Sequence, residues 1–347
     1  MKLMHIKGYL SFIFLFVSLT FSNEAHASAK TDTLTLYNGD KITCEVKKLE
    51  KGKLQVKTSD IGTLSAKWYK VAFIETKQVL EIVLHDRTKI YGTLGKADSA
   101  GYAIVSSGMM INEVYRLMDI VSINQIATGF WSGLEGSVSY GLSYAKGSDN
   151  LQSNFAANVK YRSNHFLNRV VVNSIISNNA EVLSQKQDAT YSLYYYIFKR
   201  TFLSYLVGWQ QNTELGIDNR IINGPSIGYV AVESNSNLLK TSLGVLLNIE
   251  ESNEGTRSED LEGKITATYD LYLFAHPKIT LTTMLSVFPS LTNWGRVRSD
   301  YNLQLSWEIF SNFTFGASFY ISSDNDPTST TASNLDWGTT TSIGYTF

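Results

Sequence analysis

From residue 131 to its last residue, the chain repeats segments of about 9–12 residues in which apolar and polar side chains alternate. The segment DYNLQLSWEI (300–309) is the clearest, because every second residue from Tyr301 to Ile309 is apolar and those between them are polar. The segment KITATYDLYL (264–273) repeats this pattern. A period of two is typical of a β-strand with two different faces. Ten residues is roughly the length with which a tilted strand crosses a bilayer.

Alternation alone also fits a soluble β-sandwich, in which one face of each sheet packs on a core. The connections between segments favour a membrane barrel. We predict twelve strands, which start near residues 133, 152, 168, 190, 201, 221, 238, 261, 278, 299, 313 and 336. The odd-numbered connections, such as EESNEGTRSEDLEG, are mostly long and polar, whereas even-numbered ones such as FKRT are short. Short periplasmic turns that alternate with longer outer loops, on an even strand count, are typical of an up-and-down outer-membrane β-barrel.

The chain ends in TTTSIGYTF, so its last residue is a large apolar side chain in phase with a strand. An open sheet edge in lipid leaves costly unpaired backbone groups, so the last strand is expected to pair with the first. The ending also resembles the C-terminal signal that outer-membrane barrels present to their insertion machinery. We therefore predict an assembly signal at Ile343, Gly344, Tyr345 and Phe347, with that machinery as a partner during assembly.

The first 27 residues are predicted to be a secretory signal peptide. Lys2 and Lys7 precede an apolar run over residues 9–21, and small residues flank the expected cleavage site between Ala27 and Ser28. The apolar run is shorter than the roughly 20 residues that a membrane-spanning helix needs. We expect export, and localisation in the outer membrane with outer-membrane lipid around residues 131–347.

Residues 28–130 are predicted to be a periplasmic β-domain built from a repeat. The stretches LTLYNGDKITCEVKKLEKGKLQVKT (34–58) and IVLHDRTKIYGTLGKADSAGYAIVS (82–106) align at a spacing of 48 residues. Each contains a tight turn, Asn38-Gly39 or Asp86-Arg87, and Asn-Gly between alternating strands is a strong hairpin signal. The repeat predicts two small SH3-like barrels or one fused β-domain.

Two features of this domain favour structural explanations over chemical ones. Cys44 is the only cysteine, so it cannot form an internal disulfide, and its alternating context predicts a buried side chain. The motif KWYK (67–70) is interpreted as a strand with one buried aromatic and solvated lysines rather than as a binding site.

Three stretches of the chain have a recognisable pattern: WSGLEGSVSYGLSYAKGSDN (131–150), PSLTNWGRVRSDYNLQLSWEIF (289–310) and the ending DWGTTTSIGYTF (336–347). In these stretches the chain resembles the family of salt-induced outer-membrane proteins catalogued as domain of unknown function 481. The resemblance implies an outer-membrane location and a barrel fold. It implies no catalytic residues.

We expect no enzymatic activity, and an outer-membrane hydrolase is the least favoured alternative. The expected mature chain has three histidines, His85, His165 and His276, and none lies near the outer rim where a barrel hydrolase needs its base. The sequence GPSIG (224–228) matches the Gly-x-Ser-x-Gly motif, but it begins a predicted membrane strand rather than a strand–turn–helix.

Nucleic-acid binding is not predicted either. Removing the signal peptide changes the formal net charge from −1 to −2, so the mature chain lacks the excess of basic residues that nucleic-acid-binding proteins have. Neither metal nor nucleotide motifs are present, so no cofactor is expected.

The predicted lumen face carries charges of both signs. They are Lys160, Arg162, Lys240, Lys264, Asp270, Asp300 and Glu308. Such a set fits an open pore, but it can equally pair across a narrow barrel and fill it. Two functions therefore stay open for a non-catalytic envelope or stress-related protein. One is passive passage of small solutes, and the other is a structural role in which the periplasmic domain binds an envelope or cell-wall partner.

Overall fold

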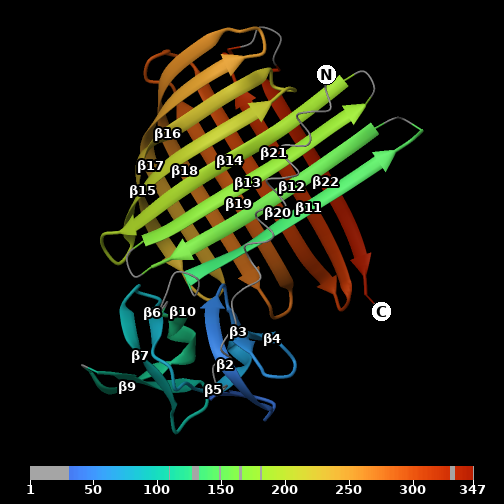
Figure 1. Cartoon of the computed structure of the whole chain (residues 1–347). Helices are drawn as coiled ribbons and strands as arrows, with labels where there is room; N and C mark the ends of the chain where they lie inside the picture. The colour runs from blue at the N-terminus through green and yellow to red at the C-terminus, as the bar shows by residue number, and fades with distance from the viewer. Residues whose placement is uncertain are drawn as a thin grey trace, which may run out of the picture.

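The structure, a computed structural model, describes residues 31–108, 110–126, 133–147, 150–163, 166–179, 182–328 and 333–346. Two antiparallel sheets account for almost all of it, and the prediction of an all-β fold is confirmed (Figure 1). The expected cleavage site at Ala27 and Ser28 and the last residue, Phe347, lie outside the described residues. In the described part of the chain, no helix has the length and apolar character required to span a membrane.

The N-terminal domain contains two repeats of five strands. Their bounds are β1 (Asp32–Leu36), β2 (Lys41–Glu50), β3 (Lys53–Lys57), β4 (Thr63–Lys67) and β5 (Val71–Glu75), then β6 (Leu80–Leu84), β7 (Lys89–Lys96), β8 (Tyr102–Ser107), β9 (Met110–Arg116) and β10 (Ile120–Gln125). In each repeat a 3₁₀ turn, η1 (Trp68–Lys70) or η2 (Leu117–Asp119), precedes the last strand. Pairing of β10 with both β6 and β2 joins the repeats into one fused domain.

One hydrophobic core serves both repeats. Its buried side chains come from the two repeats together, and Trp68 lies among them at 1% exposure. The Trp68 indole Nε1 donates a hydrogen bond of 2.6 Å to the carbonyl of Leu117 in the second repeat. Cys44 is fully buried, and burial, followed by the nearby Asp32 and Glu45 carboxylates, raises its pKa to about 11. The sequence interpretation of Cys44 as a buried side chain is confirmed.

Because every residue of this core belongs to the N-terminal domain, residues 28–130 are expected to fold without the barrel. Expressed alone, they should be soluble without detergent and unfold in one cooperative transition. Trp68→Ala should lower the free energy of unfolding by about 3–5 kcal/mol, because it empties a large buried site. The matched control is Ile61→Ala at a 72% exposed position, where a change within about 0.5 kcal/mol is expected. Urea unfolding followed by circular dichroism measures both, and aggregation of the isolated domain would contradict the expectation.

The second sheet contains the twelve predicted antiparallel strands, and each pairs with the next along the chain. They are β11 (Leu134–Ala145), β12 (Asn150–Arg162), β13 (Phe166–Asn179), β14 (Val182–Tyr196), β15 (Thr201–Asn212), β16 (Ile217–Glu233), β17 (Asn237–Ser252), β18 (Arg257–Leu273), β19 (Lys278–Pro289), β20 (Val297–Phe310), β21 (Phe313–Asp324) and β22 (Leu335–Tyr345). Figure 1 shows the sheet rolled into a barrel, with the early strands in green in front of the late strands in orange and red.

The register defines an inner and an outer face. Arg298 on β20 contacts Glu262 on β18, across the intervening strand β19, so these side chains lie on the concave face. On β18 the alternation then places Ile265 on the outer face, with 51% exposure. On β22 it places Ile343 and Tyr345 outward, at 71% and 62% exposure, and Gly344 inward. This arrangement is that of a barrel with apolar residues outside, while the role of the C-terminal residues in assembly stays a prediction.

Closure of the barrel between β11 and β22 also stays a prediction. No hydrogen-bonded ladder joins these two strands among the residues that the structure describes. Their outward side chains are widely exposed, as at Tyr140 and Trp337. Unpaired backbone groups at such edges are unfavourable in lipid, so mutual pairing of β11 and β22 is expected there.

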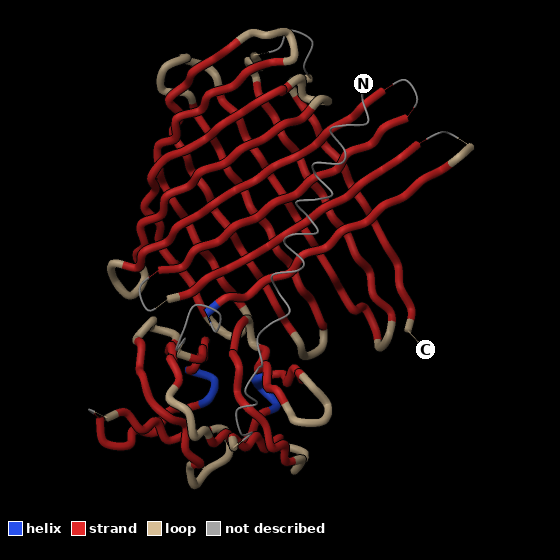
Figure 2. Tube along the Cα trace, in the orientation of Figure 1, coloured by secondary structure: helices blue, strands red, loops and turns tan. Residues whose placement is uncertain are grey.

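The predicted lengths of most distal loops are wrong, because the strands extend well beyond the apolar pattern. The fourth strand was expected near residue 190 but begins at Val182, and only residues 253–256 separate β17 from β18. The tube in Figure 2 shows strand continuing almost to these turns. In these distal strand parts polar residues occupy both faces, as in residues 250–260, so pairing continues while alternation in hydropathy ends. Two longer connections remain at this end, residues 290–296 and 325–334.

Candidate functional site

The barrel interior has two different ends, which we call domain-proximal, beside the N-terminal domain, and domain-distal. A set of buried charged residues lies on the inner face at the distal end, and we call it the distal cluster. Its members are Arg220 on β16, Glu250 on β17, Asp260 and Glu262 on β18, Arg296 and Arg298 at the start of β20, and Asp324 on β21. All but Asp324 are at most 8% exposed.

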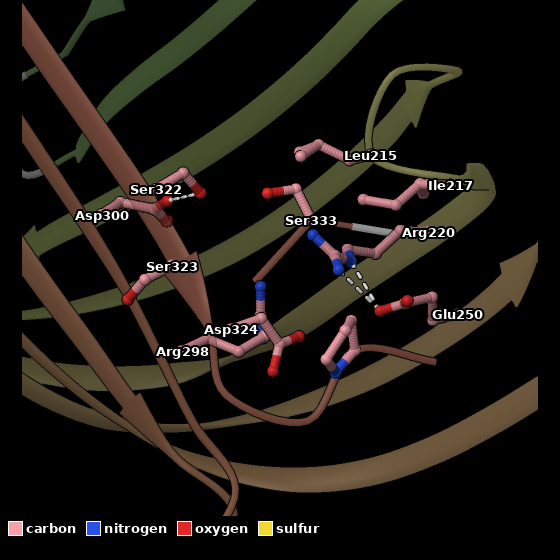
Figure 3. A pocket seen from close by; sticks show the side chains of 11 residues that line it. Leu215, Ile217, Arg220, Glu250, Arg298, Asp300, Ser322, Ser323, Asp324 and Ser333 are labelled. Carbon is pink, nitrogen blue, oxygen red and sulfur yellow. Dashed lines mark hydrogen bonds and ion pairs between the residues drawn. The ribbon is translucent and has the colours of Figure 1, made fainter. Parts of the chain in front are cut away.

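Three arginines hold the distal cluster together through short, charge-assisted hydrogen bonds. Arg298 donates to both oxygens of Glu262, at 2.9 and 2.6 Å. Arg220 donates from Nε and Nη2 to one oxygen of Glu250, at 3.0 and 2.6 Å (Figure 3). Two-point contacts of this kind fix the orientation of both partners.

Arg296 joins strands that are not neighbours in the sheet. It donates from Nη1 to Asp260 on β18 at 2.7 Å and from Nη2 to Asp324 on β21 at 2.6 Å. It precedes β20, and the carbonyl of Arg296 accepts a hydrogen bond from the backbone N–H of Ser290, which folds the β19–β20 loop over the cluster. The distal cluster is therefore a cross-brace from β16 to β21.

A second contact crosses the interior near the same end. The Lys186 ammonium on β14 lies 5.1 Å from the ring centre of Tyr320 on β21, within the range of a cation–π interaction. Beside the distal cluster, a cavity of about 30 Å³ borders Ile217, Asp300 and Pro327, among other residues. By the same measure one water needs roughly 10–15 Å³, so this cavity holds only water. The distal end is narrow on this side.

At the proximal end, the N-terminal domain contacts three of the barrel turns. Asn235, in the β16–β17 turn, donates 2.9 Å hydrogen bonds to the carbonyls of Met118 and Ile120. Lys67 and Tyr69 donate to the carbonyl of Phe274 in the β18–β19 turn, each at 3.2 Å. The KWYK interpretation is correct for buried Trp68 but wrong in assigning a strand, because Trp68–Lys70 form the 3₁₀ turn η1. Lys67 contacts the barrel instead of being only solvated.

Ion pairs strengthen the same junction. Arg87 pairs with Glu233 at the end of β16, and Lys199 in the β14–β15 turn lies 3.3 Å from Asp86. Hydrogen bonds from the Thr88 hydroxyl and backbone, together with Lys199, lower the pKa of Asp86 to about 2. Asp86 is therefore ionised at any pH well above that value.

Gly52 permits a close approach between the backbones of domain and barrel. Its φ is +69°, and a Cβ atom built there would lie 2.4 Å from the carbonyl oxygen of Asn235. Only glycine combines this backbone conformation with so short a distance.

A larger cavity, of about 470 Å³, lies between the N-terminal domain and the first two barrel strands. Its walls are polar, and they are formed by Lys47, Lys48, Gln55, Asn124, Gln125, Gly133, Glu135, Gly136 and Arg162. Lys48 pairs with Glu135 at 2.7 Å, and Arg162 lies 3.6 Å from Glu81 of the domain. The barrel interior therefore adjoins a polar space at its proximal end.

The register places all seven lumen candidates from the sequence on the inner face. They are Lys160, Arg162, Lys240, Lys264, Asp270, Asp300 and Glu308. Four of them have partners. Arg162 pairs with Glu81, Asp270 with Lys51 of the domain, and Glu308 with Lys278, while Asp300 accepts a 2.8 Å hydrogen bond from Ser322. Among the described residues, Lys160, Lys240 and Lys264 have no ion pair.

Sequence reasoning missed the distal cluster because it assigned most of these residues to loops. The alternations Asp260-x-Glu262 and Arg296-x-Arg298 place like charges two residues apart, on one face of a strand. Extending the strands to these positions would have revealed the opposing charges. In the part of the chain that the structure describes, no group of three or more His, Cys, Asp or Glu side chains is arranged to hold a metal ion.

Comparison with known proteins identifies one family. The family described as "Protein of unknown function, DUF481" matches residues 138–347. A search of curated proteins gives no significant match. Among solved structures, "NanC porin structure in rhombohedral crystal form" is similar at 8% identity, with a TM-score of 0.35, over 62% of this chain and 98% of that chain. A likeness of that degree carries no functional argument.

Proposed function

The chain belongs to the DUF481 family of proteins of unknown function, and we propose that it is a non-catalytic outer-membrane barrel through which small polar solutes pass. The observation that carries this proposal is the exposure of polar side chains on the inner face. Along β20, Arg298 at the distal end is buried, but Asn302, Gln304 and Ser306 farther along the same face are exposed. A filled interior would bury these side chains, whereas a hydrated lumen leaves them in water.

The proximal end supports passage as well. The cavity of about 470 Å³ adjoins the inner ends of β11 and β12, and polar and charged groups form its walls. It would serve as a vestibule between the lumen and the periplasm. The N-terminal domain would lie in the periplasm, since it is attached at this end.

The outer face supports the membrane location. Trp209, Trp307 and Trp337 lie on this face near strand ends, where aromatic girdles meet the membrane interface. Apolar residues such as Leu303 and Ile265 lie between these levels. Outer-membrane lipid and, during assembly, the insertion machinery are the partners that this location implies.

The absence of catalysis is part of the proposal. Ser226 of the GPSIG segment is buried within β16, in a strand rather than at a strand–turn–helix junction. The described histidines, His85 and His276, lie near the domain-proximal end. A serine nucleophile needs its base within hydrogen-bond reach. Ser226, within β16 and away from the histidines at the proximal end, does not meet this requirement.

Conductance across a planar lipid bilayer tests the proposal. Purified full-length protein, refolded and checked for its folded gel mobility, should produce stepwise conductance, and the same protein left unfolded should not. Folded protein that inserts without any conductance would overturn solute passage. That result would favour the second candidate, a structural protein whose domain binds an envelope partner through strand β9, which ends the N-terminal sheet.

A further inference from the structure

The charges on the inner face are not mixed evenly along the lumen. In the proximal half, the acidic side chains on this face are Glu135, Glu233, Asp270 and Glu308. Each of these four carboxylates is neutralised by an ion pair, with Lys48, Arg87, Lys51 and Lys278 respectively. Within the described residues, the proximal half therefore presents no uncompensated negative charge on its inner face.

Basic side chains in the same half keep their charge. Lys160 on β12, Arg169 on β13 and Lys240 on β17 have no ion pair among the described residues. The Arg169 guanidinium donates a hydrogen bond of 3.4 Å to the neutral amide of Asn158, which leaves its charge uncompensated.

The distal half has the opposite sign. Asp188 on β14, Asp300 on β20 and Asp336 on β22 lie on the inner face without an ion pair among the described residues. Asp188 accepts a 2.8 Å hydrogen bond from the Asn173 amide. The distal cluster adds to this charge, because its three arginines face four carboxylates. Against these acids the inner face of this half offers two further cations, Lys186, which lies over Tyr320, and Lys264 at the middle of β18.

The two zones also surround the lumen rather than marking one wall. The proximal cations lie on β12 and β13 and again on β17, four strands beyond β13 in the sheet. The distal carboxylates lie on β14, β20 and β22. A solute that travels along the barrel axis must therefore pass both signs of charge in turn.

We propose that this lumen is bipolar, acidic toward the cell exterior and basic toward the periplasm, and that it selects zwitterionic and other net-neutral polar solutes. The proposal deepens the solute passage proposed above and rests on it. An anion meets a repulsive field in the distal zone, and a cation meets one in the proximal zone. A zwitterion has no net charge to be repelled by either zone, and its two ends match the sequence of zones. Low-dielectric walls around a narrow lumen focus such fields.

A bipolar lumen conducts ions better in one direction of voltage. With the outer chamber positive, cations enter through the acidic zone and anions through the basic zone, so both accumulate at the boundary and current flows. With the outer chamber negative, both kinds of ion are withdrawn from the boundary, which becomes depleted. The asymmetry requires a Debye length comparable with the dimensions of the lumen. The Debye length is about 30 Å at 0.01 M salt and about 3 Å at 1 M.

The first measurement is the current–voltage curve of single full-length channels. A tag on the N-terminal domain, detected from one chamber after recording, gives the orientation of each channel. At 0.01 M KCl the conductance with the outer chamber positive should exceed that at the opposite voltage by at least about twofold, and at 1 M KCl the two should be equal. The triple variant Lys160→Gln, Arg169→Gln, Lys240→Gln should lose this rectification. The control Lys41→Gln, Lys57→Gln, Lys77→Gln removes the same charge from exposed positions of the N-terminal domain and should keep it.

The second measurement compares solutes of similar size in proteoliposomes at 0.01 M salt. Glycine betaine, a permanent zwitterion, should leave faster than methanesulfonate or tetramethylammonium, and the difference should disappear at 1 M salt. Equal conductance in both directions at low salt, or rectification that survives the lumen triple variant, would overturn the bipolar lumen. A barrel that passes no solutes is distinguished from one without a bipolar lumen, because it would show neither conductance nor release of any solute.

Discussion

Arg296→Ala should lower the free energy of unfolding of the barrel by about 3–5 kcal/mol, because it removes one partner from a buried ionic network. Arg296 is 3% exposed and contacts Asp260 and Asp324, with Glu250 at 3.6 Å. Without the guanidinium, Asp260 and Asp324 lose their main counter-charge, whereas Glu250 keeps Arg220. Urea unfolding of the protein in lipid vesicles measures the change.

The matched control for this variant is an exposed arginine–carboxylate pair on β18, two strands from β20. Arg257 lies 2.6 Å from Glu259 on β18, but their side chains are 64% and 57% exposed. Arg257→Ala should therefore cost no more than about 0–1 kcal/mol. Replacing Arg296, Asp260 and Asp324 together with apolar residues should recover much of the loss, since a buried network exchanged as a whole is often neutral. Similar effects of Arg296→Ala and Arg257→Ala would show that the distal cluster is not buried.

Leu303→Arg should destabilise the barrel by about 2–4 kcal/mol more than Gln304→Arg. The two residues are neighbours near the middle of β20, and the register places Leu303 on the outer face and Gln304 on the inner face. An arginine at position 303 would enter the hydrocarbon of the bilayer, whereas at position 304 it would enter a hydrated lumen. The same unfolding assay in lipid vesicles measures both variants.

This pair of variants separates a membrane barrel from a soluble one. If the outer face met water, arginine at position 303 would be a surface substitution with an effect within about 0.5 kcal/mol. If the interior were a packed core, arginine at position 304 would be the costly change. Equal effects, or a larger effect at position 304, would contradict the assignment of the two faces.

The strands could be predicted from sequence because lipid and lumen impose opposite requirements on alternate residues. Tyr301, Leu303 and Leu305 share one face for that reason, and the period of two is visible without any tertiary contact. The signal ends where both faces of the strands become polar. Positions such as Val182 and Arg257 therefore lie in strands that the pattern could not reveal, and the distal cluster was missed with them.

The N-terminal repeat was predictable for a different reason, since two aligned segments share their turns and apolar positions. The choice between two barrels and one fused domain stayed open, because it depends on pairing of β2 with β10, as between Leu49 and Ile123, which are far apart in the chain. The placement of the domain against the barrel depends on a few contacts such as Arg87 with Glu233. A single ion pair between surface positions leaves no periodic signal in a sequence.

Closure of the twelve strands in the outer membrane is tested most directly by the gel mobility of the protein recovered from outer membranes. A closed barrel stays folded in detergent until it is heated, so the protein should migrate faster unboiled than boiled. The unheated form should be found in the outer-membrane fraction of the cell. Recovery of the full-length protein as soluble periplasmic material, with one mobility before and after boiling, would contradict the membrane barrel.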